Sequence, residues 1–148
     1  MLRNFLHRIA GLFSRARPAR AVLGSHGERL AEKHLKGKGF SVLGRNLRTS
    51  QGEVDLLCLD PDRTTVVIVE VKTRALKAED ATLFLPPEAS ITARKRRTLL
   101  RLANGLARAN GWTHRPLRID VVAVEWLEGR EPTVRHHAGA VCAFRRTA

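Results

Sequence analysis

Apolar residues recur along this chain with two different periods, which divide it into predicted strands and helices. Strands are predicted by alternating or continuous apolar runs at residues 40–48, 52–58, 66–72, 117–126 and 133–137. Helical spacing predicts one helix over residues 25–36 and a second from Ser90 or Thr92 to Asn110. The order helix, three strands, helix, strand predicts an α/β domain.

The strands at 52–58 and 66–72 form a predicted hairpin with charge in an unusual place. A four-residue loop at 61–64 pairs Asp60 with Thr65 and sets Asp55 directly opposite Glu70. Because side chains alternate along a strand, Glu70 and Lys72 share one face. Burying such groups costs several kcal/mol each unless they are paired or neutralised by a metal. The pattern therefore predicts a metal site that hydrolyses phosphodiesters.

The second predicted helix has an apolar face and a separate basic face. The buried stripe is predicted to be Leu99, Leu102, Ala103, Leu106 and Ala109. Three-, four- and seven-residue spacings place further side chains together on another face, namely Arg94, Arg97, Arg101 and Arg108. No acidic residue lies between Glu88 and Asp120 to balance them. The stripe is therefore interpreted as a track for a phosphate backbone, with a solvated face as the alternative.

Charge composition points to the same class of partner. Lys and Arg outnumber Asp and Glu by 27 to 14, which gives a formal net charge of +13 over 148 residues. An excess of this size favours nucleic acid, most plainly DNA, and secondly an anionic membrane surface. Cys58 and Cys142 form no metal-binding spacing, which fits a reducing, cytoplasmic compartment. No apolar run is long enough for a transmembrane segment.

The chain is predicted to hold one domain, residues 23–148, behind a basic amphipathic extension, residues 1–22. Three interpretations of that extension stay open: a poorly packed linker, a docked helix, and a peripheral membrane or targeting segment. An irregular, proline-rich loop is expected between Arg74 and Pro87. A homodimer is an option that no motif establishes.

Two further acids have alternative interpretations. Glu28 shares a helix face with Ala31 and Leu35. It is either an accessory acid of the metal site or a first-turn residue whose charge interacts favourably with the helix dipole. Asp120 either pairs with a basic neighbour or reaches the metal patch.

The chain resembles the core of the PD-(D/E)XK nuclease superfamily, which includes restriction endonucleases and Holliday-junction resolvases. More narrowly it resembles the YraN family of predicted endonucleases, over about residues 24–144. The residues that carry the narrower resemblance are Gly27-Glu28-x-x-Ala31, Asn46, Gly52-Glu53-Val54-Asp55-Leu56-Leu57, Val69-Glu70-Val71-Lys72-Thr73-Arg74, Lys95 and Arg118-Ile119-Asp120-Val121-Val122.

This resemblance implies a restriction-endonuclease-like αβββαβ core with a mixed central sheet flanked by helices. It implies Asp55, Glu70 and Glu28 as metal ligands and Lys72 beside the attacking water, so that all four are candidate catalytic residues. Mg²⁺ is the expected cofactor, with Mn²⁺ as a substitute. The expected nucleic-acid-binding residues are Arg74, Arg94, Lys95, Arg97, Arg101 and Arg108.

The function expected from these features is a metal-dependent endonuclease acting on DNA, with branched or damaged DNA as candidate substrates. One alternative is a non-catalytic nucleic-acid-binding protein that keeps the nuclease fold. Another is a membrane-associated scaffold that uses residues 1–22.

Overall fold

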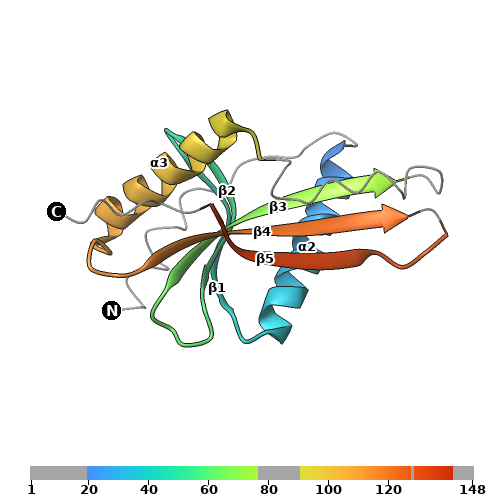
Figure 1. Ribbon diagram of the computed structural model, residues 1–148, viewed down its shortest axis with the longest axis horizontal. Helices are drawn as coiled ribbons and strands as arrows, with labels where there is room; N and C mark the ends of the chain where they lie inside the picture. Colours follow the sequence, from blue (N-terminus) through green and yellow to red (C-terminus); the bar gives the residue numbers. More distant parts are fainter. Residues whose placement is uncertain (1–19, 77–90, 128, 142–148) are drawn as a thin grey trace.

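The computed structural model of the chain describes residues 20–76, 91–127 and 129–141. The elements in chain order are α2 (Arg20–Gly37), β1 (Ser41–Thr49), β2 (Gly52–Leu59), β3 (Val66–Leu76), α3 (Ala93–Asn110), β4 (Leu117–Leu127) and β5 (Thr133–Val141). None of the helices in these ranges is both long and apolar enough to cross a membrane. Figure 1 shows the helices and the sheet.

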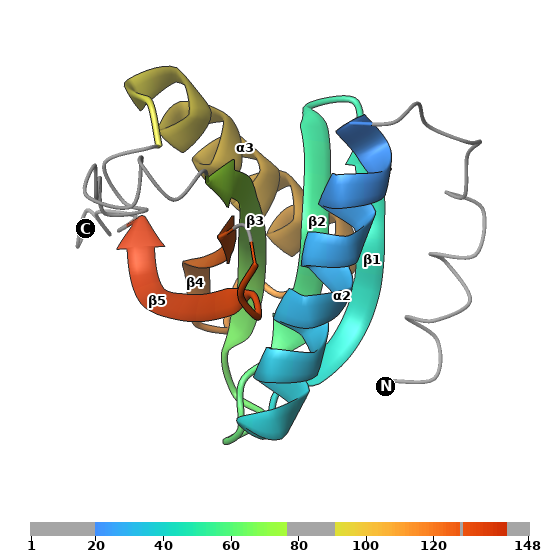
Figure 2. The ribbon, with the colours of Figure 1, turned by 90° about the vertical axis from the view of Figure 1, so that its right-hand side faces the viewer.

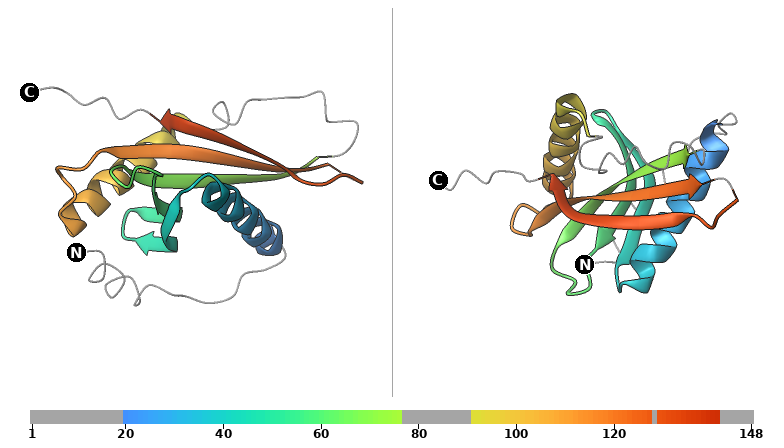
Figure 3. Two further views of the ribbon diagram at one scale, coloured as in Figure 1. Left: turned by 90° about the horizontal axis from the view of Figure 1, so that it is seen from below. Right: turned by 45° about the vertical axis from the view of Figure 1, so that its right-hand side comes forward.

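The five strands form one mixed sheet in the order β1-β2-β3-β4-β5. Neighbouring strands are antiparallel except β3 and β4, which run parallel and are connected through α3. The β3–β4 ladder is continuous from Val66↔Leu117 to Leu76↔Leu127. The β2–β3 ladder is much shorter and runs only from Leu56↔Val69 to Leu59↔Val66. Figure 3 shows β5 beside β4 at one edge of the sheet.

The two helices cover opposite faces of this sheet (Figure 2). Alternation along β3 places Val67 and Val69 in the apolar cluster under α2, with Ala31 and Leu35 of that helix. The intervening Ile68 belongs to the cluster under α3, with Leu99 and other residues of that helix. Each face of β3 therefore has its own core, and a charged side chain on this strand has to be compensated locally.

Both ends of α3 lie where the sequence predicts them. Thr92 is the N-cap, and its Oγ1 accepts a hydrogen bond from the backbone N–H of Lys95 at 3.1 Å. Gly111 ends the helix in the left-handed region, with φ 68°. Leu99, Leu102 and Ala103 are buried as predicted, whereas Ala109 is exposed.

The first helix is longer than its pattern indicates. It begins at Arg20, five residues before the predicted Ser25, and ends at Gly37 as expected. Glu28 therefore lies in the third turn, which excludes the interpretation of Glu28 as a first-turn residue that stabilises the helix dipole. β1 is shifted by one residue from its prediction, and the other strands run past their predicted ends, by four residues in β3, which reaches Leu76, and in β5, which reaches Val141. Of the extension predicted at residues 1–22, residues 20–22 belong to α2 and residues 1–19 lie outside the described residues, as does the predicted loop from residue 77 to Pro87.

Candidate active site

The predicted hairpin register is confirmed, and the site lies where its two strands separate. Asp60 N donates to Thr65 O at 3.1 Å, and pairing continues to Leu56↔Val69. One residue further, strand-to-strand pairing stops. Asp55 instead accepts a hydrogen bond from the backbone N–H of Val71, through Oδ2 at 2.8 Å. Its carboxylate thus lies against the backbone of the residue that follows Glu70.

Glu70 is buried, with 4% of its side chain exposed, and it faces two ammonium groups. Lys72 Nζ donates to Glu70 Oε1 at 2.8 Å, which confirms that these two side chains share a face. Lys95 Nζ, from the first turn of α3, lies 2.9 Å from Oε2. That second contact is close enough for an ion pair but does not have the geometry of a hydrogen bond. Oε2 is buried and has no hydrogen-bond partner among the described residues.

Asp55 is poorly compensated by comparison. Burial raises the pKa of its carboxyl to about 7, and the negative charges of Glu70 and Glu28 act in the same direction. The hydrogen bond from Val71 and the ammonium group of Lys95 act against this rise. Asp55 and Glu70, here called the acidic pair, therefore lie in unequal environments at the point of strand separation, because both ion pairs with lysine are formed by Glu70.

Glu28 approaches the acidic pair from α2 because that helix packs closely on β3. A Cβ atom at Gly27 would lie 1.9 Å from Thr73 Oγ1, so the packing admits only glycine at this position. The electrostatic effect of Glu28 on Asp55 places Glu28 near the pair. Lys95 comes from the helix on the other face. The candidate site therefore draws side chains from both helical layers.

Asn46 of β1 explains how Asp55 comes to lie between the two layers. Its φ of 48° is in the left-handed region, which Asn adopts more readily than most residues. In the β1–β2 ladder Arg45↔Leu56 and Leu47↔Val54 are paired, and the intervening Asn46 and Asp55 are not.

At Asn46 and Asp55, the side chains of β1 and β2 stop alternating regularly between the two faces of the sheet. On β2, Leu56 packs in the cluster under α2, but Val54, two residues away, packs in the cluster under α3 with Leu57. Regular alternation would put Val54 and Leu56 on the same face. This break in the alternation leaves Asp55 at the junction of the faces, directed to the gap between β2 and β3.

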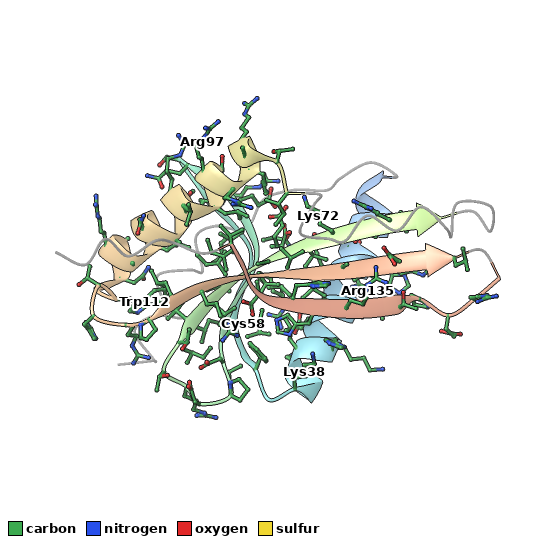
Figure 4. The ribbon with its side chains drawn as sticks, viewed as in Figure 1. Lys38, Cys58, Lys72, Arg97, Trp112 and Arg135 are labelled. Carbon is green, nitrogen blue, oxygen red and sulfur yellow. The ribbon has the colours of Figure 1, made fainter. Side chains whose placement is uncertain are left out.

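The four arginines of α3 predicted to share a face are all exposed: Arg94, Arg97, Arg101 and Arg108, here called the arginine track. None of them forms an ion pair within the described ranges. Figure 4 shows Arg97 pointing outward from α3, away from the sheet. Arg74 follows Lys72 by two residues on β3 and is half-buried at the far end of that strand.

Asp120 belongs to a separate, satisfied network. It is fully buried, accepts two hydrogen bonds from Arg118 at 2.8 and 3.0 Å, and accepts a third from Gly139 N at 2.9 Å. His136 Nε2 lies 2.8 Å from its Oδ2. Of the two roles left open for Asp120, pairing with a basic neighbour is the one observed. Cys58 is likewise a core residue, since burial raises the pKa of its thiol to about 12.

The acidic pair offers the hard carboxylate oxygens that the expected Mg²⁺ prefers. Among the described residues no group of three or more His, Cys, Asp or Glu is arranged to hold a metal ion. Mg²⁺ needs fewer protein ligands than that, because it keeps several waters and binds through one or two carboxylates plus substrate phosphate. The buried oxygen of Glu70 without a hydrogen bond and the raised pKa of Asp55 both fit a divalent cation at this point.

Lys95 occupies a different position from the one the sequence interpretation gave it. It was grouped with the nucleic-acid-binding residues of α3, but its side chain is half-buried and faces Glu70. The signal was present in the sequence: Lys95 precedes Leu99 by four residues and Leu102 by seven, so it shares their buried face. The left-handed conformation of Asn46 had no comparable signal.

Comparisons with known proteins place the chain in a family. The model of the uncharacterised protein family UPF0102 matches residues 27–124, a segment that contains Glu28, the acidic pair, Lys72 and Lys95. A UPF0102 protein of Anaeromyxobacter dehalogenans (strain 2CP-C) is 39% identical over 121 residues, covering 82% of this chain and 84% of that protein. One from Mycobacterium avium (strain 104) is 37% identical over 131 residues, covering 88% and 98%.

A solved structure also resembles the chain, a repair endonuclease from Pyrococcus abyssi. The TM-score is 0.42 and the sequence identity 18%, with 79% of this chain covered but only 42% of that one. The sequence matches are stronger and extend over most of both partners. The chain therefore belongs to the UPF0102 family, in agreement with the resemblance to YraN proteins that its motifs carry.

Proposed function

We propose that this protein is a metal-dependent nuclease that hydrolyses phosphodiester bonds of DNA. The observation that carries the proposal is the acidic pair, two carboxylates held at a break in the sheet, where burial and the charge of Glu70 raise the pKa of Asp55 to about 7. A hairpin built for stability alone would have apolar or hydroxyl side chains there. Function accounts for their retention, because perturbed acids of this kind cluster at catalytic sites.

Asp55 and Glu70 are the residues that would hold Mg²⁺, with Glu28 in the outer shell. When bound, the ion would polarise a phosphate oxygen and lower the pKa of a water ligand. Lys72 Nζ keeps one oxygen of Glu70 fixed by its hydrogen bond and places a positive charge beside the reacting phosphate. Burial of Glu70 excludes bulk water, which strengthens each of these interactions.

The arginine track supplies the substrate contact in this proposal. Its guanidinium groups extend along α3 from the end that lies at the site. Exposed arginines without carboxylate partners are suited to bind phosphate oxygens. Such contacts position a nucleic acid without reading its sequence. DNA structure, including branches or damage, is therefore the property by which substrates would be distinguished. The cytoplasmic location expected from the sequence remains a prediction, and a homodimer remains an option.

The decisive experiment is a cleavage assay with Mg²⁺ or Mn²⁺ on duplex, single-stranded, nicked and branched DNA. Wild type is compared with Asp55→Ala, Glu70→Ala and Lys72→Ala. The matched control is Glu53→Gln, since Glu53 lies on the same strand as Asp55 but is next to Arg48, at 3.8 Å. Loss of cleavage in the three variants, with folding and DNA binding intact, supports the proposal. Cleavage that survives all three substitutions rules out this site.

The exposed arginine track also favours a second function, a nucleic-acid-binding protein that does no chemistry. The same assay separates the two. DNA binding without cleavage of any substrate, in either metal, would favour the second function.

A further inference from the structure

Lys95 is the one ammonium group that reaches the acidic pair from outside the sheet, among the residues the structure describes. It lies on α3, and Lys72 on β3 contacts the opposite oxygen of the same carboxylate. Glu70 thus has an ammonium group at each oxygen. A divalent ion bound to Glu70 at Oε2 would lie close to the Lys95 ammonium group, so the two positive charges compete for this oxygen.

The two lysine contacts differ in a way that identifies which one gives way. Lys72 forms a hydrogen bond to Oε1, whereas Lys95 is held at Oε2 by charge without hydrogen-bond geometry. A divalent cation at Oε2 replaces one positive charge with two, so it satisfies the acidic pair better than the ammonium group does. Repulsion between the cation and the ammonium group then drives Lys95 away.

The position of Lys95 on α3 determines where it goes. It is in the first turn, next to Arg94 at the head of the arginine track, and about a third of its side chain is already exposed. The helix carries no acidic residue that could capture it. A phosphate group of DNA bound along the arginine track is then the anion with which the released ammonium group can pair.

We propose that Lys95 occupies the cation position in the metal-free protein and moves to the substrate phosphate when a divalent ion binds. The inference rests on the proposed function, because it requires a metal site at the acidic pair. It gives Lys95 a positioning role and makes metal binding and DNA binding mutually favourable. By linkage, each ligand raises the affinity for the other by the same factor.

The direct test is the chemical reactivity of individual lysines, measured on the full chain by trace amine labelling and mass spectrometry with and without Mn²⁺. Calorimetry on the same samples shows whether the ion binds. Lys95 should label several-fold faster once Mn²⁺ is bound. Lys36 is the internal control, because it is also ion-paired, at 2.6 Å from Glu32, but away from the site.

The possible outcomes separate this inference from the proposed function. If Mn²⁺ binds and Lys95 labelling stays unchanged or slows, the role of Lys95 as a placeholder for the cation is wrong, whereas the nuclease proposal stands. An equal rise at Lys36 also overturns the placeholder role, since it reports general loosening. If calorimetry detects no ion, the proposed metal site itself fails, and this inference fails with it.

A second measurement uses DNA binding by fluorescence anisotropy, with Ca²⁺ against EDTA. Wild type should gain about fivefold or more in DNA affinity from the ion. Lys95→Met should lose most of that gain, whereas Arg97→Met, on the same helix, should weaken binding equally in both conditions. A full gain in Lys95→Met would overturn the inference.

Discussion

Asn46 lies opposite Asp55 between the paired positions of β1 and β2, and the left-handed backbone of the first sets the direction of the second. The relationship is geometric rather than a side-chain contact. Because the side chains of β1 stop alternating between the two faces of the sheet at Asn46, those of β2 stop alternating at Asp55. The Asp55 carboxylate therefore points into neither apolar cluster.

Replacement of Asn46 tests this relationship. Asn46→Gly should retain activity, because glycine adopts φ > 0 without steric cost. Asn46→Val should destabilise the fold by about 1–2 kcal/mol and reduce cleavage more than its lost stability explains. Denaturant unfolding and metal-dependent cleavage are measured on both variants. Equal activity in the two variants at a temperature where both are folded would contradict the role assigned to this backbone.

The raised pKa of Asp55 predicts a stability that depends on pH. The folded protein holds the Asp55 proton up to a pKa of about 7, whereas an unfolded chain releases it near the ordinary aspartate pKa of 3.8. The folded state therefore loses stability as pH rises through this range, because burying the ionised carboxylate is unfavourable. Asp55→Asn, which can still accept from Val71, should remove that loss.

We expect Asp55→Asn to be more stable than wild type in EDTA, by an amount that grows from pH 4 to pH 7 and then levels off. The plateau is at most about 4 kcal/mol, from roughly 1.4 kcal/mol per pK unit. Thermal unfolding across pH measures it, with Glu53→Gln as the control that should show no such growth. Mg²⁺ should stabilise wild type and not Asp55→Asn. A variant less stable than wild type at pH 8 would contradict the prediction.

The packing of α2 on β3 predicts that Gly27 tolerates no side chain. In Gly27→Ala the new methyl group would overlap Thr73 Oγ1, so the helix must shift and take Glu28 with it. Overpacking of this kind costs about 1–3 kcal/mol. Gly24→Ala on the same helix is the matched control, since a Cβ there meets nothing within 4 Å. Chemical denaturation distinguishes them, and Thr73→Ala in the Gly27→Ala background should recover part of the lost stability, because it removes the Oγ1 atom that the new methyl group meets.

The arginine track predicts a salt dependence of DNA binding that falls with each residue removed. Each phosphate contact contributes a slope of about −0.9 in log K against log salt on duplex DNA. Single variants Arg101→Ala and Arg108→Ala should each reduce the slope by about one unit. Arg130→Ala, exposed in the turn between β4 and β5, should leave it unchanged. An unchanged slope in the two track variants would show that DNA does not bind along α3.

Much of this arrangement was predictable because it depends on local rules. The register that sets Asp55 across from Glu70 follows from loop length, and the ends of α3 follow from Thr92 and Gly111. The exposed arginines follow from helical spacing. The early start of α2 at Arg20 is not predicted, because Gly24 and Gly27 are poor helix formers and Ser25 is a typical N-cap residue.

The failures have a common physical origin in tertiary contacts. Nothing in the sequence near Asn46 indicates a left-handed residue inside a strand. The approach of α2 to Thr73 is visible only once the sheet is assembled. The contact of Lys95 with Glu70 is likewise tertiary, although its spacing from Leu99 already indicates the helix face that it shares.

The short ladder between β2 and β3 has a mechanical consequence. β1 and β2 form one half of the sheet and β3, β4 and β5 the other, joined by the four pairs from Leu56↔Val69 to Leu59↔Val66 and by the hydrogen bond from Val71 N to Asp55. Asp55 belongs to the first half and Glu70 to the second, so the two acids lie on opposite sides of this seam, just beyond its last ladder pair. Coordination of an ion by both acids would lock the halves together.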